Sequence, residues 1–149
     1  MYAAYESDPR WSWRDYSVIK LLDVETGNQK TVTHKTKYFT PDISASGTKI
    51  AAVELEGNGR SELHIIDAIT GEIKNRIASS EVSVFTDPKF INEDTLVAAL
   101  RLKNGEMALA RINTETGGIT RITPPSFNVV GFSLCQQWHC LFHGVLRRQ

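Results

Sequence analysis

The sequence has little cysteine, no excess charge of either sign and no long apolar run. It holds two cysteines in 149 residues, five positions apart near the C-terminal end. Such a pair cannot form the disulfide framework of a small secreted domain, and it leaves the redox compartment open. Lysine plus arginine equals aspartate plus glutamate, at 17 each, so the basic surface that nucleic acids or anionic membranes require is missing. No stretch approaches the roughly 18 apolar residues of a transmembrane helix.

Two further signals are missing from the chain. The first 17 residues, MYAAYESDPRWSWRDYS, lack the basic and then apolar order of a signal peptide. No glycine-rich phosphate loop is present. The length suits one ordinary domain with a real core. We therefore expect a soluble chain with no nucleic-acid partner, no membrane insertion and no cofactor.

One turn motif occurs three times at nearly equal spacing. A short aliphatic run leads into Asp or Asn, two variable residues, Thr and Gly, as in SVIKLLDVETG, ELHIIDAITG and MALARINTETG. The Asx side chain can bond the backbone downstream of it, and Gly accepts positive φ. Another β-type run follows each turn, so each motif predicts a hairpin. The Asx positions are Asp23, Asp67 and Asn113, which are 44 and 46 residues apart.

A second marker repeats with the same period. YFTPDISASGTKIAAVEL (38–55) matches VFTDPKFINEDTLVAAL (84–100), because each has an aromatic residue, Thr and Pro, then a turn and an apolar strand. The polar loops EGNGRS and RLKNGE follow, and Asn104-Gly105 is a hairpin dipeptide. Each unit therefore contains four short strands joined by tight turns.

Four-stranded units with this period are typical of β-propeller blades. Helical repeats of similar length would need sustained 3.6-residue periodicity, which these short runs lack. A β-sandwich has similar strand spacing, but its strands need not repeat one another. We therefore predict an all-β fold, an incomplete β-propeller with about two full four-stranded blades and partial blades at each end.

One stretch of the sequence supports a specific resemblance. The sequence from Tyr38 onward resembles the TolB-type, WD40-like propeller repeat, whose blades read P-x-x-S-P-D-G-K-x-I-A-F and then S-E-L-Y-V-M-D-x-x-T-G. Ala45 and Ser46 stand where that pattern has Pro and Asp, and the resemblance covers roughly Ser17 to Thr123. The matching positions are Pro41, Ser44, Gly47, Lys49, Ile50, Ala51, Glu62, Leu63, Ile65, Asp67, Thr70 and Gly71.

This resemblance implies a fold of six or seven blades when complete, with ligands at the central opening on loops that differ between members. Family members are often envelope or exported proteins, which suggests the bacterial periplasm or cell envelope, although no signal peptide is seen here. The same propeller also occurs as the non-catalytic domain of serine peptidases. No catalytic, cofactor-binding or metal-binding residue can be carried over to a position in this chain.

The repeats predict domain boundaries. Residues 1–16 form an N-terminal extension, 17–33 the last hairpin of one blade, 38–77 and 84–123 two full blades, and 126–132 the start of another. This is less than half a propeller, and repeats bury their faces on their neighbours. We therefore expect a fragment of a longer protein, and we expect the isolated chain to self-associate through exposed blade edges.

Residues 133–149 break the repeat pattern. The turn of another blade is due near position 139, but the chain reads QQWHCLFHGVLRRQ there. A reading frame shifted by one nucleotide turns the single Trp codon of Trp138 into Gly and permits S-N-G-T-V-Y-F-T. That Gly would lie 91 residues after Gly47, two repeat periods on. We interpret the tail as out of frame, and translation of the gene in three frames tests this interpretation.

The tail also contains chemically reactive residue types. Cys135, His139, Cys140 and His143 are possible zinc ligands, but the two pairs interleave instead of following the usual spacing. GFSLC, from Gly131 to Cys135, approaches the G-x-S-x-G nucleophile elbow but lacks the final Gly. The plain structural alternative is a free surface thiol.

Candidates elsewhere in the chain are weak. Trp11 and Trp13 could form a stacking platform for a sugar or peptide, although such a pair more often covers the end of a sheet. Asp8, Asp15 and Asp42 suggest calcium, but no loop has the alternating oxygen ligands of an EF-hand-like site. We therefore assign no site residue to this group.

The last candidate site residues are two histidines. His34 and His64 lie in different strands or loops without an evident partner, and His64, inside ELHIID, is predicted to be a solvent-facing strand residue. No catalytic, metal or cofactor residue is therefore predicted.

The pattern predicts a non-catalytic fragment that acts as a protein-interaction or ligand-binding scaffold. Propeller loops present an adaptable polar surface on a rigid support, so another protein or peptide is the expected partner. The alternative is the accessory propeller domain of a larger serine peptidase or hydrolase whose catalytic part is missing. A third hypothesis is a small metal-binding regulator that uses the tail, and a zinc stoichiometry of one that is lost on Cys135→Ser would favour it.

Overall fold

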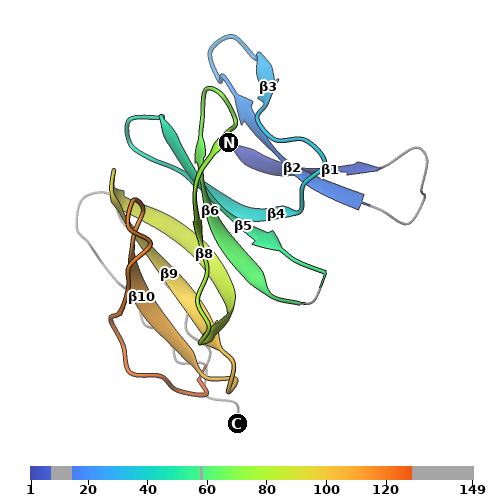
Figure 1. Ribbon diagram of the computed structural model, residues 1–149. Helices are drawn as coiled ribbons and strands as arrows, with labels where there is room; N and C mark the ends of the chain where they lie inside the picture. Colours follow the sequence, from blue (N-terminus) through green and yellow to red (C-terminus); the bar gives the residue numbers. More distant parts are fainter. Residues whose placement is uncertain (8–14, 58, 129–149) are drawn as a thin grey trace.

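The computed structural model describes residues 1–7, 15–57 and 59–128, and every helix or strand in this part of the chain is a β-strand. The strands form three antiparallel sheets that follow one another along the chain (Figure 1). None of these residues forms a helix of the length and apolarity needed to cross a membrane. The prediction of an all-β fold with repeated antiparallel sheets is therefore confirmed.

Each sheet is a meander of neighbouring strands. The first sheet has the order β1-β2-β3, with β1 (Tyr2–Ser7), β2 (Asp15–Leu22) and β3 (Gln29–Thr31). The second has the order β4-β5-β6-β7, with β4 (Tyr38–Ile43), β5 (Lys49–Leu55), β6 (Ser61–Asp67) and β7 (Ile73–Ile77). The third has the order β8-β9-β10-β11, with β8 (Val82–Asn92), β9 (Thr95–Leu102), β10 (Met107–Asn113) and β11 (Ile119–Arg121).

The first sheet begins earlier than the repeats indicate. Tyr2 to Ser7, which lie in the expected N-terminal extension, form β1 and pair with β2 from Lys20 back to Asp15. The sequence next to this strand has no Asx-x-x-Thr-Gly turn motif. The repeated markers therefore could not predict β1. At the other end, Ser126 exchanges two backbone hydrogen bonds with Met107 of β10, at 2.7 and 3.0 Å. The rest of the expected next blade, residues 129–132, lies outside the described residues.

The repeated turn motif has the geometry that its residues favour. The carboxylate of Asp67 accepts hydrogen bonds from the backbone N–H groups of Ile69 and Thr70, at 2.8 and 2.9 Å. The corresponding oxygens of Asp23 and Asn113 do the same in the first and third sheets. The Gly residues that end the three motifs all have φ between 72° and 77°. The motif therefore closes the hairpin between the third and fourth strands of each four-stranded unit.

This turn gives the protein one predictable response to acid. The N–H groups of Thr70 and Ile69 hold the pKa of Asp67 below its usual range, with the charge of Lys74 adding to the effect. A carboxyl group with a depressed pKa stabilises the fold above its unfolded-state pKa, and that contribution is lost as the pH falls through the folded-state value. Asn113 makes the same two bonds without titrating. We therefore expect Asp67→Asn to keep its stability at pH 7 and to lose less stability than the parent below about pH 4.

Urea unfolding midpoints measured from pH 7 to pH 2 check this expectation. Asn113→Asp is the reciprocal control, because it places a titrating group in an equivalent turn and should steepen the loss in acid. Parallel acid profiles for the parent and Asp67→Asn would contradict the argument.

Apolar side chains fill both spaces between neighbouring sheets. Strand β5 serves both, since Ala51 and Val53 pack toward the third sheet whereas Ile50 and Ala52 pack toward the first. Burial on both faces explains why the run IAAV is apolar at every position and does not alternate with polar residues. A third cluster, Ala99, Met107 and Leu109, lies on the other face of the third sheet.

A serine joins each sheet to the next at the same place. The hydroxyl of Ser17 in β2 donates to the carbonyl of Tyr38 in β4, at 2.5 Å. The hydroxyl of Ser61 in β6 accepts from the N–H of Phe85 in β8, at 2.8 Å. These serines are 44 residues apart, so the repeat governs the contacts between sheets as well as the sheets themselves.

Candidate functional site

Strands β4 and β8 lie next to each other where the second and third sheets meet, and both carry a β-bulge (Figure 1). Pairing shifts between Phe39 and Asp42 in β4, and between Thr86 and Lys89 in β8. We call the bulged parts of these two strands, residues 39–42 and 86–89, the inner edge. Each strand ends its sheet, so one side of each has no strand partner in the described chain.

The inner edge stores backbone strain at two equivalent points. Thr40 and Asp87 have φ of 45° and 47°, the left-handed region that favours glycine. Each follows a fully buried aromatic residue, Tyr38 or Phe85, by two positions. Such residues cost about 1–3 kcal/mol each and persist where the surrounding structure imposes them. Both side chains are exposed, so the repeated distortion presents Thr40 and Asp87 to solvent.

A polar clamp fixes the two bulges relative to each other. The carboxylate of Asp42 accepts a hydrogen bond from the N–H of Phe90 at 2.8 Å and pairs with the ammonium of Lys89 at 3.1 Å. Asp42 was considered as a calcium ligand, but its two oxygens are used in joining the inner strands. The clamp makes the inner edge a fixed surface on a rigid support.

The prediction that His64 faces solvent is wrong. Its side chain is fully buried, because the second sheet is covered on both faces and even-numbered residues of β6 point toward the first sheet. Its Nδ1 lies 2.7 Å from the hydroxyl of Tyr38, and its Nε2 lies 3.1 Å from the carboxylate of Glu62. Glu54 also approaches, with 3.5 Å between its carboxylate and Nδ1.

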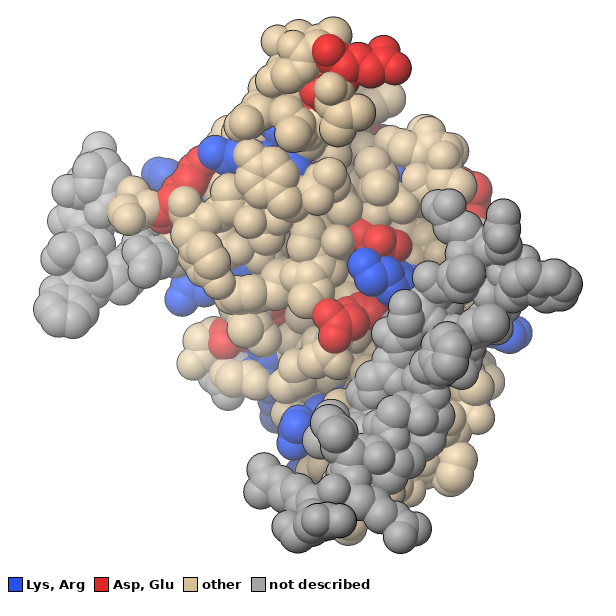
Figure 2. All heavy atoms as spheres, turned by 180° about the vertical axis from the view of Figure 1, so that it is seen from behind, with Lys and Arg blue, Asp and Glu red and all other residues tan. Residues whose placement is uncertain are grey.

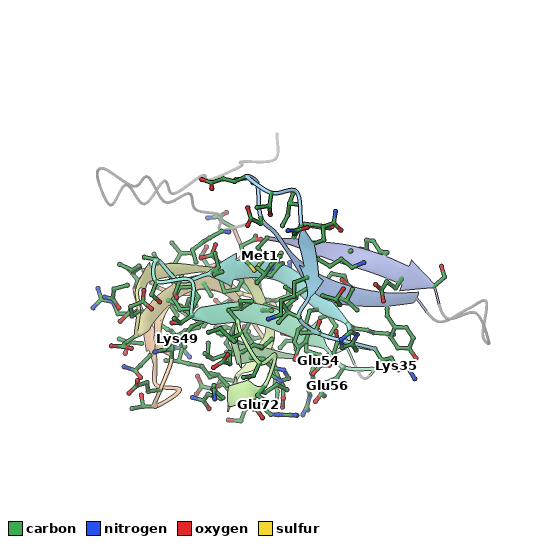
Figure 3. All side chains as sticks on the ribbon, turned by 90° about the horizontal axis from the view of Figure 1, so that it is seen from above. Met1, Lys35, Lys49, Glu54, Glu56 and Glu72 are labelled. Carbon is green, nitrogen blue, oxygen red and sulfur yellow. The ribbon has the colours of Figure 1, made fainter. Side chains whose placement is uncertain are left out.

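Tyr38 keeps its proton in this site. Burial and then the charge of Glu54 raise the pKa of Tyr38 well above its usual range, so the phenol stays neutral. It shares one hydrogen bond with Nδ1 of His64, which also lies near the carboxylate of Glu54. This Tyr–His–Glu chain has the order of a proton relay, but Tyr38 is only 1% exposed. We assign the cluster a structural role, at the end of the sheet where Figure 3 shows Glu54 and Glu56.

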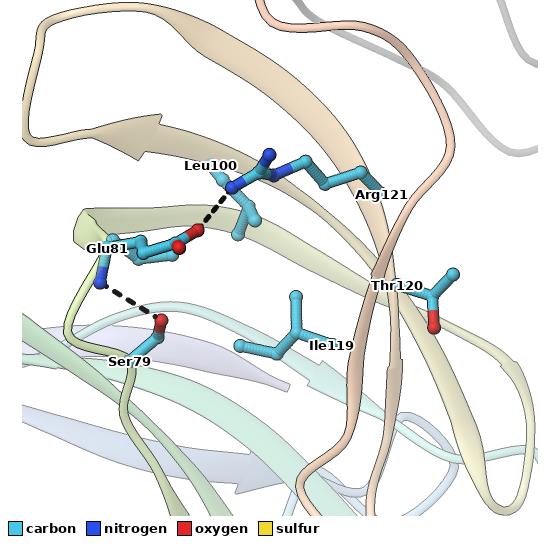
Figure 4. A pocket seen from close by; sticks show the side chains of 7 residues that line it. Ser79, Glu81, Leu100, Ile119, Thr120 and Arg121 are labelled. Atoms are coloured by element: carbon cyan, nitrogen blue, oxygen red, sulfur yellow. Dashed lines mark hydrogen bonds and ion pairs between the residues drawn. The ribbon is translucent and has the colours of Figure 1, made fainter.

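Two pockets are lined by described residues of the second and third sheets. One, of about 370 Å³, has Val82, Leu100 and Ile119 as its apolar wall. Its polar residues include Ser79 and an ion pair of Glu81 with Arg121 (Figure 4). The other, of about 440 Å³, is lined by Thr48, Lys49, Ile65, Asp67, Lys74, Asn75, Thr114 and Glu115.

The two pockets reach the size of small-ligand sites. In the second pocket Lys49 pairs with Glu115 at 3.7 Å, and it also pairs with Asp94 outside the lining at 2.9 Å. In the first pocket the hydroxyl of Ser79 accepts a hydrogen bond from the backbone N–H of Glu81, and the carboxylate of Glu81 pairs with Arg121.

Most candidate residues from the sequence cannot be placed. Trp11, Trp13 and Asp8 lie outside the described residues, as do the GFSLC segment and the tail residues Cys135, His139, Cys140 and His143, together with the frame interpretation of the tail. His34 is exposed in the loop between β3 and β4. Within residues 1–7, 15–57 and 59–128, no three His, Cys, Asp or Glu side chains are grouped so that they could hold a metal ion.

Surface charge gives no field of one sign on the face in Figure 2. Acidic and basic side chains lie there in small mixed groups. The balance of 17 basic and 17 acidic residues agrees with this picture. Charge therefore does not distinguish one surface from another, and the inner edge differs from the rest because it is polar and held in place.

No protein-family model matches the sequence, and no curated protein matches it. Solved structures do match. The β-propeller domain of the trilobed protease from Pyrococcus furiosus, described as having an open velcro topology, aligns with a TM-score of 0.67 and 14% identity, over 88% of this chain and 41% of that one. A putative TolB from Agrobacterium tumefaciens aligns with a TM-score of 0.63 and 14% identity, over 82% of this chain and 44% of that one.

A third match is the acylaminoacyl peptidase from Pyrococcus horikoshii, with a TM-score of 0.62 and 15% identity, over 87% of this chain and 24% of that one. This chain thus spans less than half the length of each structure named. These likenesses establish an incomplete β-propeller fold and confirm the resemblance to TolB-type propellers at the level of fold.

Proposed function

We propose that the chain is a non-catalytic propeller scaffold whose inner edge binds an extended polypeptide. The observation that carries the proposal is the strain repeated at Thr40 and Asp87, two equivalent and exposed positions. Strain of this kind clusters at binding and catalytic sites, and no catalytic group adjoins these residues in the described chain. The resemblance to TolB proteins supports a bacterial envelope location as part of the same proposal.

A polypeptide suits this surface better than a small molecule does. Strands β4 and β8 each leave one side unpaired in the described chain, and free N–H and C=O groups are a template for an extended chain. Neither pocket is lined by a residue of the inner edge. Thr40, Asp87 and Lys89 supply the polar groups that would set the register of the bound segment.

Selection of displayed random peptides against the full chain tests the proposal. We expect the selected peptides to bind the Asp87→Lys variant at least about 10-fold more weakly, because a charge at the inner edge is reversed. Glu25→Lys, the same charge reversal in the exposed turn after β2, is the matched control and should bind as the parent does. Equal binding to the parent and Asp87→Lys would overturn the proposal.

Two of the matched structures favour a second candidate, because they come from a trilobed protease and an acylaminoacyl peptidase. In that case the chain is the accessory propeller of a larger serine peptidase or hydrolase, and the inner edge meets polypeptide substrates. The test is the gene sequence on either side of this chain. An adjoining α/β domain with a nucleophile motif would favour this candidate over a free-standing scaffold.

A further inference from the structure

The outer strand of the second sheet contains one residue more than its counterparts in the neighbouring sheets. In β7 the pairing shifts by one residue, because Ile65 lies opposite Asn75 whereas the next residue of β6 lies opposite Ile73. Lys74 stands between these two positions and is therefore the extra residue of a β-bulge. The corresponding pairs of the first and third sheets follow one another without a shift. Bulges are frequent beside functional sites, where they aim a side chain.

The residue after the bulge makes a contact that both junctions between sheets have. The side-chain amide of Asn75 donates to the carbonyls of Thr114 and Glu115, both at 2.9 Å. At the junction of the first and second sheets, the ammonium of Lys30 donates to the carbonyl of Ile69 at 2.6 Å. Ile69 and Glu115 are each the third residue of their turn motif, and the two donors hold equivalent places in their strands. The bulge residue is therefore not needed to join the sheets.

Lys74 lines the pocket of about 440 Å³, which lies between the second and third sheets. Strands β5, β6 and β7 supply one wall, and Thr114 and Glu115, in the turn after β10, supply the other. Ile65 is the apolar residue of the lining and is almost fully buried. Both sheets have four strands in the described chain, so both walls of the pocket belong to complete sheets.

Two charged groups of this pocket are only loosely paired. The ammonium of Lys74 lies 3.6 Å from the carboxylate of Asp67 and 3.7 Å from that of Glu72, beyond the length of a hydrogen bond. The carboxylate of Glu115 lies 3.7 Å from the ammonium of Lys49, which donates instead to another carboxylate at 2.9 Å. Exposed pairs of this kind contribute little to stability, so a ligand can replace them. The pocket thus offers a cation on the second sheet and an anion on the third.

We propose that this pocket binds a free amino acid with an apolar side chain. The carboxylate of the amino acid pairs with Lys74, its ammonium pairs with Glu115, and its side chain covers Ile65. A zwitterion suits the pocket because an anion alone is repelled by the carboxylate on the third sheet, and a cation alone by the ammonium on the second. The site is separate from the inner edge, since no residue of 39–42 or 86–89 lines it.

Titration of the full chain with L-leucine, followed by NMR of the backbone amides, tests the proposal. We expect saturable shifts at residues 48–49, 74–75 and 114–115, and none in the first sheet. L-Leucinamide lacks the carboxylate and N-acetyl-L-leucine lacks the ammonium. Each analogue should bind at least about 10-fold more weakly than leucine, because each loses one charge-assisted hydrogen bond. Binding of either analogue as tight as that of leucine, or shifts confined to other parts of the chain, would overturn the proposal.

Two variants assign the charges of the ligand to their partners. Lys74→Gln should bind leucine no better than leucinamide, and Glu115→Gln should bind leucine no better than N-acetyl-leucine, whereas a merely structural role would leave both preferences unchanged. Lys103→Gln, the same change at an exposed lysine after β9, is the matched control and should bind as the parent does. A preference that stays unchanged in either variant would overturn the proposal. Asp87→Lys should bind leucine as the parent does, so failure of the inner-edge proposal is read separately.

Discussion

Replacing Gly71 by alanine is expected to lower the free energy of unfolding by about 3 kcal/mol, against about 1 kcal/mol for the same change at Gly27. The two glycines end the same turn motif in neighbouring sheets, and their φ angles are 77° and 72°. Alanine at either position must adopt a left-handed backbone conformation, and this lowers the free energy of unfolding by a similar amount in both variants. The difference between the two variants must come from what surrounds them.

The surroundings differ because each turn of this kind meets the sheet before it. A Cβ atom at Gly71 would clash with the backbone oxygen of Val32, just after β3, whereas a Cβ at Gly27 would meet nothing within 4 Å. At Gly117 the nearest atom is a side-chain carbon of Ile77, at 3.6 Å, which is ordinary contact. A side chain can adjust, but the backbone at Val32 can move only if the first and second sheets separate.

Urea unfolding of the three alanine variants measures how far each substitution lowers the free energy of unfolding. Gly27→Ala and Gly117→Ala serve as matched controls for the backbone conformation, and both should lose about 1 kcal/mol. Similar losses for all three variants would contradict the close approach of the second sheet's turn to the first sheet. The ranking depends on the contact between sheets, so it also tests the propeller arrangement.

The turns and hairpins could be predicted because their causes are local. Asp67 binds the N–H groups of residues two and three positions ahead, and Gly71 supplies the positive φ that the turn needs. A pattern of that kind is visible in any stretch of sequence. The spacing between successive Asx residues then indicated the repeated sheets.

Features that depend on neighbouring sheets could not be predicted. His64 follows the alternation of a strand, and alternation does not say whether a second sheet covers the other face. Thr40 is a β-branched residue, for which a φ of 45° is unfavourable, so its conformation comes from the packing of the inner strands. The inner edge was therefore missed. Its one visible signal in the sequence was the repeated aromatic-Thr-Pro marker, and that marker does not show which strands lie side by side in the fold.

The variants Tyr38→Phe and His64→Leu are each expected to lower the free energy of unfolding by about 2 kcal/mol, and the double variant by less than their sum. Either single change leaves a buried polar group without its partner, because Tyr38 and His64 bond each other at 2.7 Å in a site that is almost fully buried. Removing both groups leaves no such orphan between them.

Unfolding free energies in urea at pH 7 for the parent, both single variants and the double variant give the coupling energy directly. Glu62 keeps exposed surface and can turn to water, so its loss of His64 adds little to the cost. We therefore expect the double variant to be about as stable as either single variant. Additive losses would show that the phenol and the imidazole act independently, and would contradict a hydrogen bond between them that contributes to stability. A coupled result would show that a buried polar pair, and not apolar packing alone, stabilises the face of the second sheet that packs on the first.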